Sequence, residues 1–447
     1  MTAGLAALGT EDGAAGYVVQ TTRSSEMMSR REALATTVAA GVVTAAATAA
    51  AAAPEKAAVS FGNPDDPPQG AINATNPRSI TDPGPQNPAI RDQFPSAFSP
   101  PPTDVGTMPL SWATFNNAPR RIQNGGWARQ VTQSDFAVAD TISGVNMRLT
   151  SGGIREMHWH QFAEWAYMTY GSCRVTVLDA AGRPYIADVK EGDLWYFPAG
   201  FPHSLQGLAP DGCEFLLCFD EGHASEYATL LLTDWFAHTP PNILAENFGV
   251  PAEAFARIPL RDLYIFQGHL PGDLAADRQA VSGKGAPPHP FTFSLGSIAP
   301  TRETRGGTVR VADSKNFTVS TTIAAAHLTI RPGGMREMHW HPNADEWQYW
   351  IKGKGTMTIF NTGPNAVTMN FNPGDIGYVK RNLGHYIKNT GDTDLQVLEV
   401  FRAPQFMDVS LSDWITHTPP ELVAQHLNVS AETIAKFPRD KPEIVPV

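Results

Sequence analysis

A long internal repeat constrains the fold more than any other feature of this 447-residue chain. The segment Gly152–His160 (GGIREMHWH) returns about 181 residues later as Gly333–His341 (GGMREMHWH). Each copy is followed by a further matching segment, Leu232–Pro240 in the first and Leu411–Pro419 in the second. Solenoid proteins repeat units of about 20–50 residues. A repeat of this length therefore predicts a duplicated domain.

Each copy consists of short apolar or alternating runs separated by Gly, Pro and Asp. The runs are Val145–Leu149, Arg174–Leu178, Leu194–Phe197 and Glu214–Phe219 in the first copy, and His327–Ile330, Thr356–Phe360 and Leu395–Phe401 in the second. Many short strands at intervals of about 8–12 residues are typical of β-sandwiches and barrels. Thr-Pro-Pro then favours helix starts before Pro241–Phe248 and Pro420–Leu427. We expect two all-β barrels in tandem, each with a small helical appendage.

The first copy carries a candidate metal-binding set: His158, His160, Glu164 and His203. Successive strand side chains alternate between faces, so the two histidines of His-x-His point to the same side. Glu164 keeps that parity, and His203 follows about forty residues later, after the turn residues of 192–200. Three imidazoles and one carboxylate make a mixed nitrogen and oxygen site.

The second copy carries the matching set His339, His341, Glu346 and His385. Glu346 has the opposite parity, so a bulge or loop must absorb one residue if this side chain is to point inward. Four such ligands leave two positions open on an octahedral ion, which suits chemistry better than a structural zinc site. The ligand types alone permit manganese, iron, nickel or copper.

Composition excludes some other classes of protein. The formal net charge is −11 and no Lys/Arg cluster is present, so a nucleic-acid partner is not expected. The three cysteines, Cys173, Cys213 and Cys218, form no CxxC pair and cannot supply a disulfide framework. We expect them to be small core residues.

The N-terminus has the pattern of an export signal. Arg30 and Arg31 precede the uncharged, Ala-rich run 33–53, which ends in small residues where cleavage is expected, within 47–53. A basic pair before a mildly apolar stretch is typical of twin-arginine signals; an Ala-rich helix or linker is the alternative. We expect a periplasmic or secreted protein, exported folded, whose mature form has no membrane segment.

These patterns divide the chain into five parts. They are an N-terminal extension with the signal (1–53), an extended Pro- and Asn-rich arm (54–119), a first barrel (120–270), an interdomain linker (271–300) and a second barrel (301–447).

The ordered set of glycines and ligands resembles the two motifs of the cupins, whose fold is a double-stranded β-helix or jelly roll. The first copy has Gly152, His158, His160, Glu164, Gly171, Gly192, Pro198, Gly200 and His203, and the second has Gly333, His339, His341, Glu346, Gly353, Gly374, His385 and Asn389. More narrowly, residues of about 85–435 resemble the bacterial bicupin oxalate decarboxylases, with matches at 144–149, 164–167, 192–198, 232–240 and 346–349.

The resemblance implies a lyase that splits oxalate into formate and carbon dioxide. It implies Mn²⁺ in both barrels, two ions per chain, and a requirement for dioxygen. It also implies a homohexamer, a dimer of trimers, in which extended arms are exchanged between subunits.

The resemblance further implies roles for four residues. Arg155 would bind and polarise a carboxylate of oxalate, and Glu226 would be a mobile lid residue that handles the proton. Arg336 and Glu399 would be the corresponding pair in the second barrel. Because Arg155 stands three residues before His158, a straight strand would place it on the other face, and we expect the turn at Gly152-Gly153 to bring it round.

Departures from the family pattern leave alternatives open. Tyr227 and Ala228 stand where the family's lid normally has Asn and Ser, and Lys380 and Asn382 replace the usual Pro and small residue. Since the lid helps to decide the products, one alternative is an oxalate oxidase that forms carbon dioxide and hydrogen peroxide. Another is a periplasmic manganese-binding or storage cupin.

Overall fold

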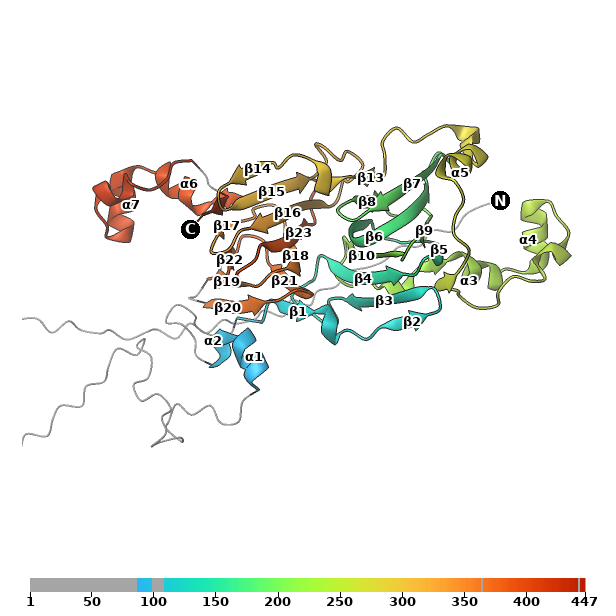
Figure 1. Cartoon of the computed structure of the whole chain (residues 1–447), viewed down its shortest axis with the longest axis horizontal. Helices are drawn as coiled ribbons and strands as arrows, with labels where there is room; N and C mark the ends of the chain where they lie inside the picture. Colours follow the sequence, from blue (N-terminus) through green and yellow to red (C-terminus); the bar gives the residue numbers. More distant parts are fainter. Residues whose placement is uncertain (1–86, 99–107, 363–364, 441–442, 447) are drawn as a thin grey trace, which may run out of the picture. The chain divides into compact units, whose positions relative to one another are not determined.

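The computed structural model describes residues 87–98, 108–362, 365–440 and 443–446 (Figure 1). The predicted export signal, 1–53, and most of the predicted arm, 54–119, lie outside the described residues. Within the described part of the chain, none of the helices has the length and apolar character that a membrane span requires.

The first barrel is built from one 12-stranded sheet that curls on itself. Its strands are β2 (Arg121–Gln123), β3 (Gly126–Val131), β4 (Ser143–Leu149), β5 (Gly153–Trp159), β6 (Glu164–Leu178), β7 (Pro184–Lys190), β8 (Leu194–Phe197), β9 (His203–Gly207), β10 (Cys213–Phe219), β11 (Leu230–Leu231), β12 (Ile265–Gln267) and β13 (Thr292–Phe293). All four apolar runs predicted for this copy lie in these strands.

The second barrel has a seven-stranded and a six-stranded sheet. Its strands are β1 (Trp112–Thr114), β14 (Arg302–Thr304), β15 (Gly307–Ala312), β16 (Ala324–Ile330), β17 (Met335–Trp340), β18 (Glu346–Lys352), β19 (Gly355–Asn361), β20 (Asn365–Phe371), β21 (Asp375–Val379), β22 (Gly384–Asn389), β23 (Leu395–Phe401), β24 (Val409–Ser410) and β25 (Ile444–Val445). The two tandem barrels confirm the predicted architecture.

One glycine in each barrel marks the point where the chain passes from one set of partner strands to another. The first half of β6 pairs with β8 and β10, and its second half pairs with β7 and β9. Gly171, between the halves, has φ +70° and meets the carbonyl oxygen of Gly212 so closely that a Cβ would lie 2.1 Å from it. Gly353 has φ +82° at the corresponding break between β18 and β19. Only glycine adopts such a conformation without strain.

The helices agree with the predicted appendages. The structure has α1 (Pro88–Gln93), α2 (Pro95–Phe98), α3 (Leu232–Ala237), α4 (Pro241–Phe248), α5 (Leu274–Ala280), α6 (Leu411–Thr416), α7 (Pro420–Leu427) and α8 (Ala431–Ile434). The predicted helices correspond to α4 and α7, which begin at a proline and end before the left-handed residues Gly249 and Asn428. Proline at the first helical position and a left-handed residue after the last are common helix boundaries.

Residues 271–300, expected to be a linker, cover the first barrel instead. Asp277 on α5 accepts a 2.6 Å hydrogen bond from Arg174 of β6, and β13 pairs with β8. The described end of the predicted arm packs on the second barrel of the same chain, where β1 pairs with β21 and Gln93 donates to Asp375.

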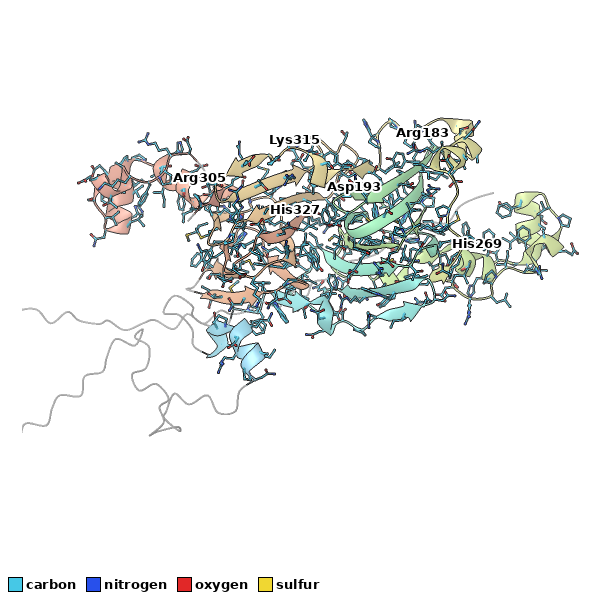
Figure 2. The ribbon with its side chains drawn as sticks, viewed as in Figure 1. Arg183, Asp193, His269, Arg305, Lys315 and His327 are labelled. Atoms are coloured by element: carbon cyan, nitrogen blue, oxygen red, sulfur yellow. The ribbon has the colours of Figure 1, made fainter. Side chains whose placement is uncertain are left out.

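Each barrel has its own apolar core, and a third cluster joins the two. The joining cluster includes Trp165 and Leu216 of the first barrel and Trp347 and Leu398 of the second, all fully buried. His327 of β16, which is labelled in Figure 2, stacks on Tyr167 of β6 in the same region, with ring centroids 5.9 Å apart. The three cysteines are unpaired and buried, as predicted.

Candidate metal centres

The first predicted ligand set comes together inside the first barrel. His158, His160, Glu164 and His203 are all buried, and their ligand atoms lie within 4.8 Å of one another. His158 lies near the end of β5 and pairs directly with His203, the first residue of β9. His160 follows the end of β5, and Glu164 begins β6.

The second set repeats this arrangement. His339, His341, Glu346 and His385 are buried with their ligand atoms within 4.8 Å of one another. His339 of β17 pairs with His385 of β22, and Glu346 begins β18.

A loop, not strand parity, positions both glutamates. Glu164 and Glu346 are each the first residue of the strand after the His-x-His strand, and residues 160–163 and 341–345 form the connections. The second connection is one residue longer, which confirms that a loop absorbs the extra residue before Glu346. Glu164 was predicted to point inward because it keeps the face alternation of the two histidines. That reason was wrong, because Glu164 does not share a strand with the histidines.

Backbone carbonyls orient five of the six histidines through Nδ1. The contacts are His158 to Glu156 (2.5 Å), His203 to Phe201 (2.8 Å), His339 to Glu337 (2.7 Å), His341 to Met407 (2.7 Å) and His385 to Leu383 (3.0 Å). A carbonyl oxygen can only accept, so Nδ1 carries the proton and Nε2 keeps its lone pair. This is the usual outer contact of a histidine that binds a metal through Nε2.

The atoms that these five imidazoles and the two glutamates turn toward one another are therefore acceptors. In the second centre, Oε2 of Glu346 lies 2.9 Å from Nε2 of both His341 and His385. Among the described residues, these three atoms and Nε2 of His203 and His339 have no hydrogen-bond partner. Buried acceptors that converge without a donor are satisfied by a cation, so the residues fit a metal ion.

Electrostatics favour the metal-binding protonation states. Burial, with the charge of the nearby arginine, lowers the pKa of His158 and of His339 well below the usual value. Neutral imidazole and ionised carboxylate are the forms that bind metals.

The two glutamate ligands are held by different donors, which the sequence did not reveal. In the first barrel, Nε1 of Trp195 donates to Oε1 of Glu164 at 2.8 Å. In the second, Nε2 of Gln348 donates to Oε1 of Glu346 at 2.6 Å, and Trp350 donates to Gln348 at 3.2 Å. A tryptophan or glutamine in an apolar run gives no sequence signal of such a role.

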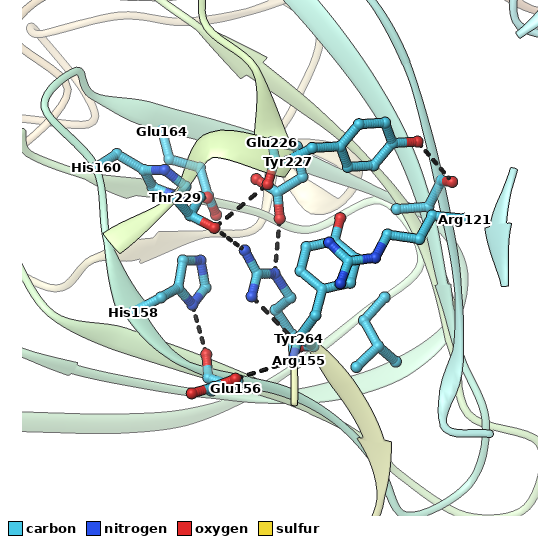
Figure 3. A network of polar contacts seen from close by, with 12 residues as sticks. Arg121, Arg155, Glu156, His158, His160, Glu164, Glu226, Tyr227, Thr229 and Tyr264 are labelled. Carbon is cyan, nitrogen blue, oxygen red and sulfur yellow. Dashed lines mark hydrogen bonds and ion pairs between the residues drawn. The ribbon is translucent and has the colours of Figure 1, made fainter. Parts of the chain in front are cut away.

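Arg155 is fully buried beside the first centre, together with Glu226 (Figure 3). Its Nε donates to Oε1 of Glu226 at 2.6 Å, and its Nη2 donates to Thr229 at 2.9 Å. The pairing of β5 with β9 shifts register between Arg155 and His158. This bulge in β5 brings the side chains of Arg155 and His158 together. The prediction that a turn at Gly152-Gly153 does so was wrong.

Tyr264 is a site residue that sequence reasoning missed. It is fully buried, has φ 51°, and its ring lies between the guanidinium groups of Arg155 (4.3 Å) and Arg121 (3.9 Å). Burial raises the pKa of its hydroxyl well above the usual value. Glu156 holds this backbone by accepting from the amides of Leu263 and Tyr264. Contacts between residues more than a hundred positions apart leave no local signal.

The second barrel differs in its arginine partner. Nη2 of Arg336 donates to Asp408 at 2.5 Å, whereas neither carboxylate oxygen of Glu399 has a hydrogen-bond partner among the described residues. Asp408 is the residue before β24, and Thr229 is the residue before β11, so the partners of the two arginines hold corresponding positions in the two barrels. Glu399 is buried on β23, opposite Gln348, and burial with the charge of Glu346 raises its pKa well above the usual value.

Comparisons with known proteins agree with this architecture. The Cupin family model matches residues 113–254 and 293–435. Oxalate decarboxylase OxdC of Bacillus subtilis is 48% identical over 354 residues, which cover 79% of this chain and 91% of that protein. An oxalate decarboxylase of Arthroderma benhamiae is 36% identical over 391 residues, covering 81% of this chain and 90% of that protein.

Solved structures give the same result. A structure of the Bacillus subtilis enzyme, from work on its Mn(II) centres, superimposes with a TM-score of 0.79 at 46% identity, covering 81% of this chain and 96% of that one. Its structure at pH 4.6 gives 0.78, with 94% of that chain covered. The chain therefore belongs to the cupins and, within them, to the bicupin oxalate decarboxylase family.

Proposed function

We propose that this chain is a manganese-dependent oxalate decarboxylase, which splits oxalate into formate and carbon dioxide and requires dioxygen. The observation that carries this proposal is the buried pair of Arg155 and Glu226 beside a complete set of three histidines and one glutamate. A protein that only stored manganese would need the ligands but would have no use for a buried arginine and a proton-transfer group.

The two ligand sets would hold the two ions. One ion would be bound by His158, His160, Glu164 and His203, and the other by His339, His341, Glu346 and His385. When bound, Mn²⁺ supplies a Lewis acid with open positions for oxalate oxygens and a redox couple for one-electron exchange with dioxygen.

Arg155 would bind and orient the substrate. A guanidinium group presents a planar fork of donors that matches a carboxylate, and its complete burial makes that charged contact strong. Its Nη1 also donates to the carbonyl oxygen of Tyr264 at 3.3 Å, which fixes the plane of the group. Arg155 would therefore present the same donors to each incoming oxalate.

Glu226 would move the proton. Its Oε1 is held by Arg155, whereas its Oε2, within the described part of the chain, has no hydrogen-bond partner and can take a proton. Hydrogen oxalate would give its proton to Oε2, the C–C bond would break with release of carbon dioxide, and the same proton would return to the carbon to complete formate. Burial keeps bulk water from competing for that proton.

A product assay with and without metal tests the proposal. The purified protein, loaded with Mn²⁺, is expected to turn oxalate into equal amounts of formate and carbon dioxide, and removal of the metal by a chelator is expected to abolish turnover. Hydrogen peroxide in place of formate would support the oxidase alternative. Full manganese occupancy with negligible turnover would support a storage protein.

We also propose that the chain is exported by the twin-arginine route. The support is Arg30-Arg31 followed by the uncharged run 33–53, both outside the described residues. Replacing both arginines by lysine is expected to retain the precursor in the cytoplasm of the producing cell. Cell fractionation would measure this, and unchanged export would refute it.

Finally, we propose a homohexamer of two trimers. Its support is apolar surface near the helical appendages: Trp235 and Trp414 are each 61% exposed, and Leu260 is 88% exposed. Light scattering on the purified protein would give the mass, and a monomer would contradict the proposal.

A further inference from the structure

We propose that Tyr227 is a latch that holds the segment Ser225–Thr229, here called the lid, closed over the first centre. Through the lid, Tyr227 would determine how oxalate is divided between decarboxylation and oxidation. The lid contains the 3₁₀ turn Glu226–Ala228, so its position sets the position of Glu226. The effect on products rests on the proposed function, whereas the latch itself does not.

The hydroxyl of Tyr227 fastens the lid to β3. It donates to the carbonyl oxygen of Ala128 at 3.1 Å (Figure 3). Burial raises the pKa of Tyr227, so the hydroxyl remains a donor throughout the acidic and neutral range. The ring also packs edge-on against Tyr264, with centroids 6.1 Å apart.

A second attachment to the same strand lies beside the first. Oε1 of Gln130 accepts from the amide of Glu226 at 3.0 Å and from the hydroxyl of Ser225 at 3.1 Å. Gln130 and Ala128 are two residues apart on β3. The residue that carries the proton is therefore held between two attachments to one strand, at Ser225 and at Tyr227.

The closed lid protects the proton on which formate depends. With the lid closed, Glu226 and Arg155 are both 0% exposed. In decarboxylation, the electron pair of the broken C–C bond stays on the formate carbon, which receives the proton from Glu226. If the lid opens first, that proton is lost to water; two electrons then pass to dioxygen, which takes two protons to become hydrogen peroxide, and both carbons leave as carbon dioxide.

The substitution Tyr227→Phe isolates the latch. It removes the hydroxyl and keeps the ring against Tyr264, and the loss of one neutral hydrogen bond changes an equilibrium roughly five-fold. Tyr227→Ala removes the ring contact as well. Tyr170→Phe is the matched control, because Tyr170 also donates through its hydroxyl, to Asp211, but lies on the exposed side of β6 away from the lid.

Two measurements on the Mn-loaded protein test the latch. Hydrogen–deuterium exchange of the lid amides is expected to be roughly five-fold faster in Tyr227→Phe and faster still in Tyr227→Ala. The ratio of peroxide to formate is expected to rise by about the same factor. The manganese content and the thermal midpoint of the variants should stay unchanged. The Tyr170→Phe control should keep the lid exchange and the product ratio of the wild type. Unchanged lid exchange in both Tyr227 variants would overturn the latch.

Failure of the latch and failure of the proposed function give different results. If the wild-type protein forms no formate, the proposed function fails, and the exchange data still decide the latch. If exchange accelerates but the wild-type product ratio is retained, the lid does not control the partition and that part of the inference is overturned.

Discussion

Nε of Arg155 lies 2.6 Å from Oε1 of Glu226, and neither side chain is exposed to solvent. Burial of a charged pair costs free energy unless its hydrogen bonds are satisfied. Here Glu226, Thr229 and the backbone of Tyr264 take three of the five N–H donors of Arg155, whereas Oε2 of Glu226 is left without a partner among the described residues. The unpartnered Oε2 of Glu226 is therefore the defined place at which the pair can receive a ligand.

Glu226→Gln is expected to lower kcat for decarboxylation by at least about 10²-fold, because an amide cannot carry the proton to carbon. Manganese content should be unchanged, since Glu226 is not among the ligands. Steady-state formate production and metal analysis would measure both quantities. The control is Glu221→Gln, a nearby, more exposed glutamate. Retained activity in Glu226→Gln would show that another group moves the proton.

Arg155 and Arg336 are expected to differ in their contribution to oxalate turnover. Arg155→Lys should lower kcat/KM by about 10²-fold, because lysine cannot present two parallel donors to a carboxylate. Arg336→Lys should have a much smaller effect, because the second barrel lacks a pair like that of Arg155 and Glu226, and Arg336 is bound by Asp408 instead. Kinetics of both variants, with thermal midpoints to verify folding, test this asymmetry. Equal losses would mean that both barrels bind oxalate in the same way.

Gln348→Met is expected to weaken the second metal centre selectively. Gln348 donates to Oε1 of Glu346, and loss of such an outer contact typically costs about 10–100-fold in metal affinity. Titration with Mn²⁺ should show one weakened site and one unchanged site per chain. Two unchanged sites would show that Glu346 needs no such support.

Stability is expected to fall in acid through His327. Burial, with the charge of Arg310, lowers the pKa of His327 to about 4, below the value of about 6.5 in an unfolded chain. The unfolded state therefore binds more protons between these pH values. The contribution of His327 is complete above pH of about 6.5 and is lost as pH falls toward about 4, with a total of about 3 kcal/mol.

His327→Gln should remove this part of the pH dependence. Urea unfolding at neutral and at acidic pH would compare the variant with wild type, and the exposed His289→Gln serves as control. An identical acid-induced loss of stability in His327→Gln and wild type would contradict the assignment.

Much of the fold and of both metal sites could be predicted because the determining patterns are local. His-x-His on one strand, the apolar runs and the Thr-Pro-Pro helix starts depend on neighbouring residues, and the structure has the strands and α4 and α7 where these patterns place them. Glu164 was predicted as a ligand on the wrong ground, since a loop carries it into the site.

What could not be predicted depends on tertiary contacts. Tyr264 reaches Arg155 from more than a hundred residues away, and Asp408 rather than Glu399 meets Arg336. The β5 bulge is likewise set by pairing with β9, not by the sequence around Arg155.

Decarboxylation of oxalate is tested by ¹³C NMR of the products that the Mn-loaded protein forms from ¹³C-labelled oxalate. One formate is expected for each carbon dioxide, without accumulation of hydrogen peroxide. Carbon dioxide without formate, or no turnover with both centres filled, would contradict it.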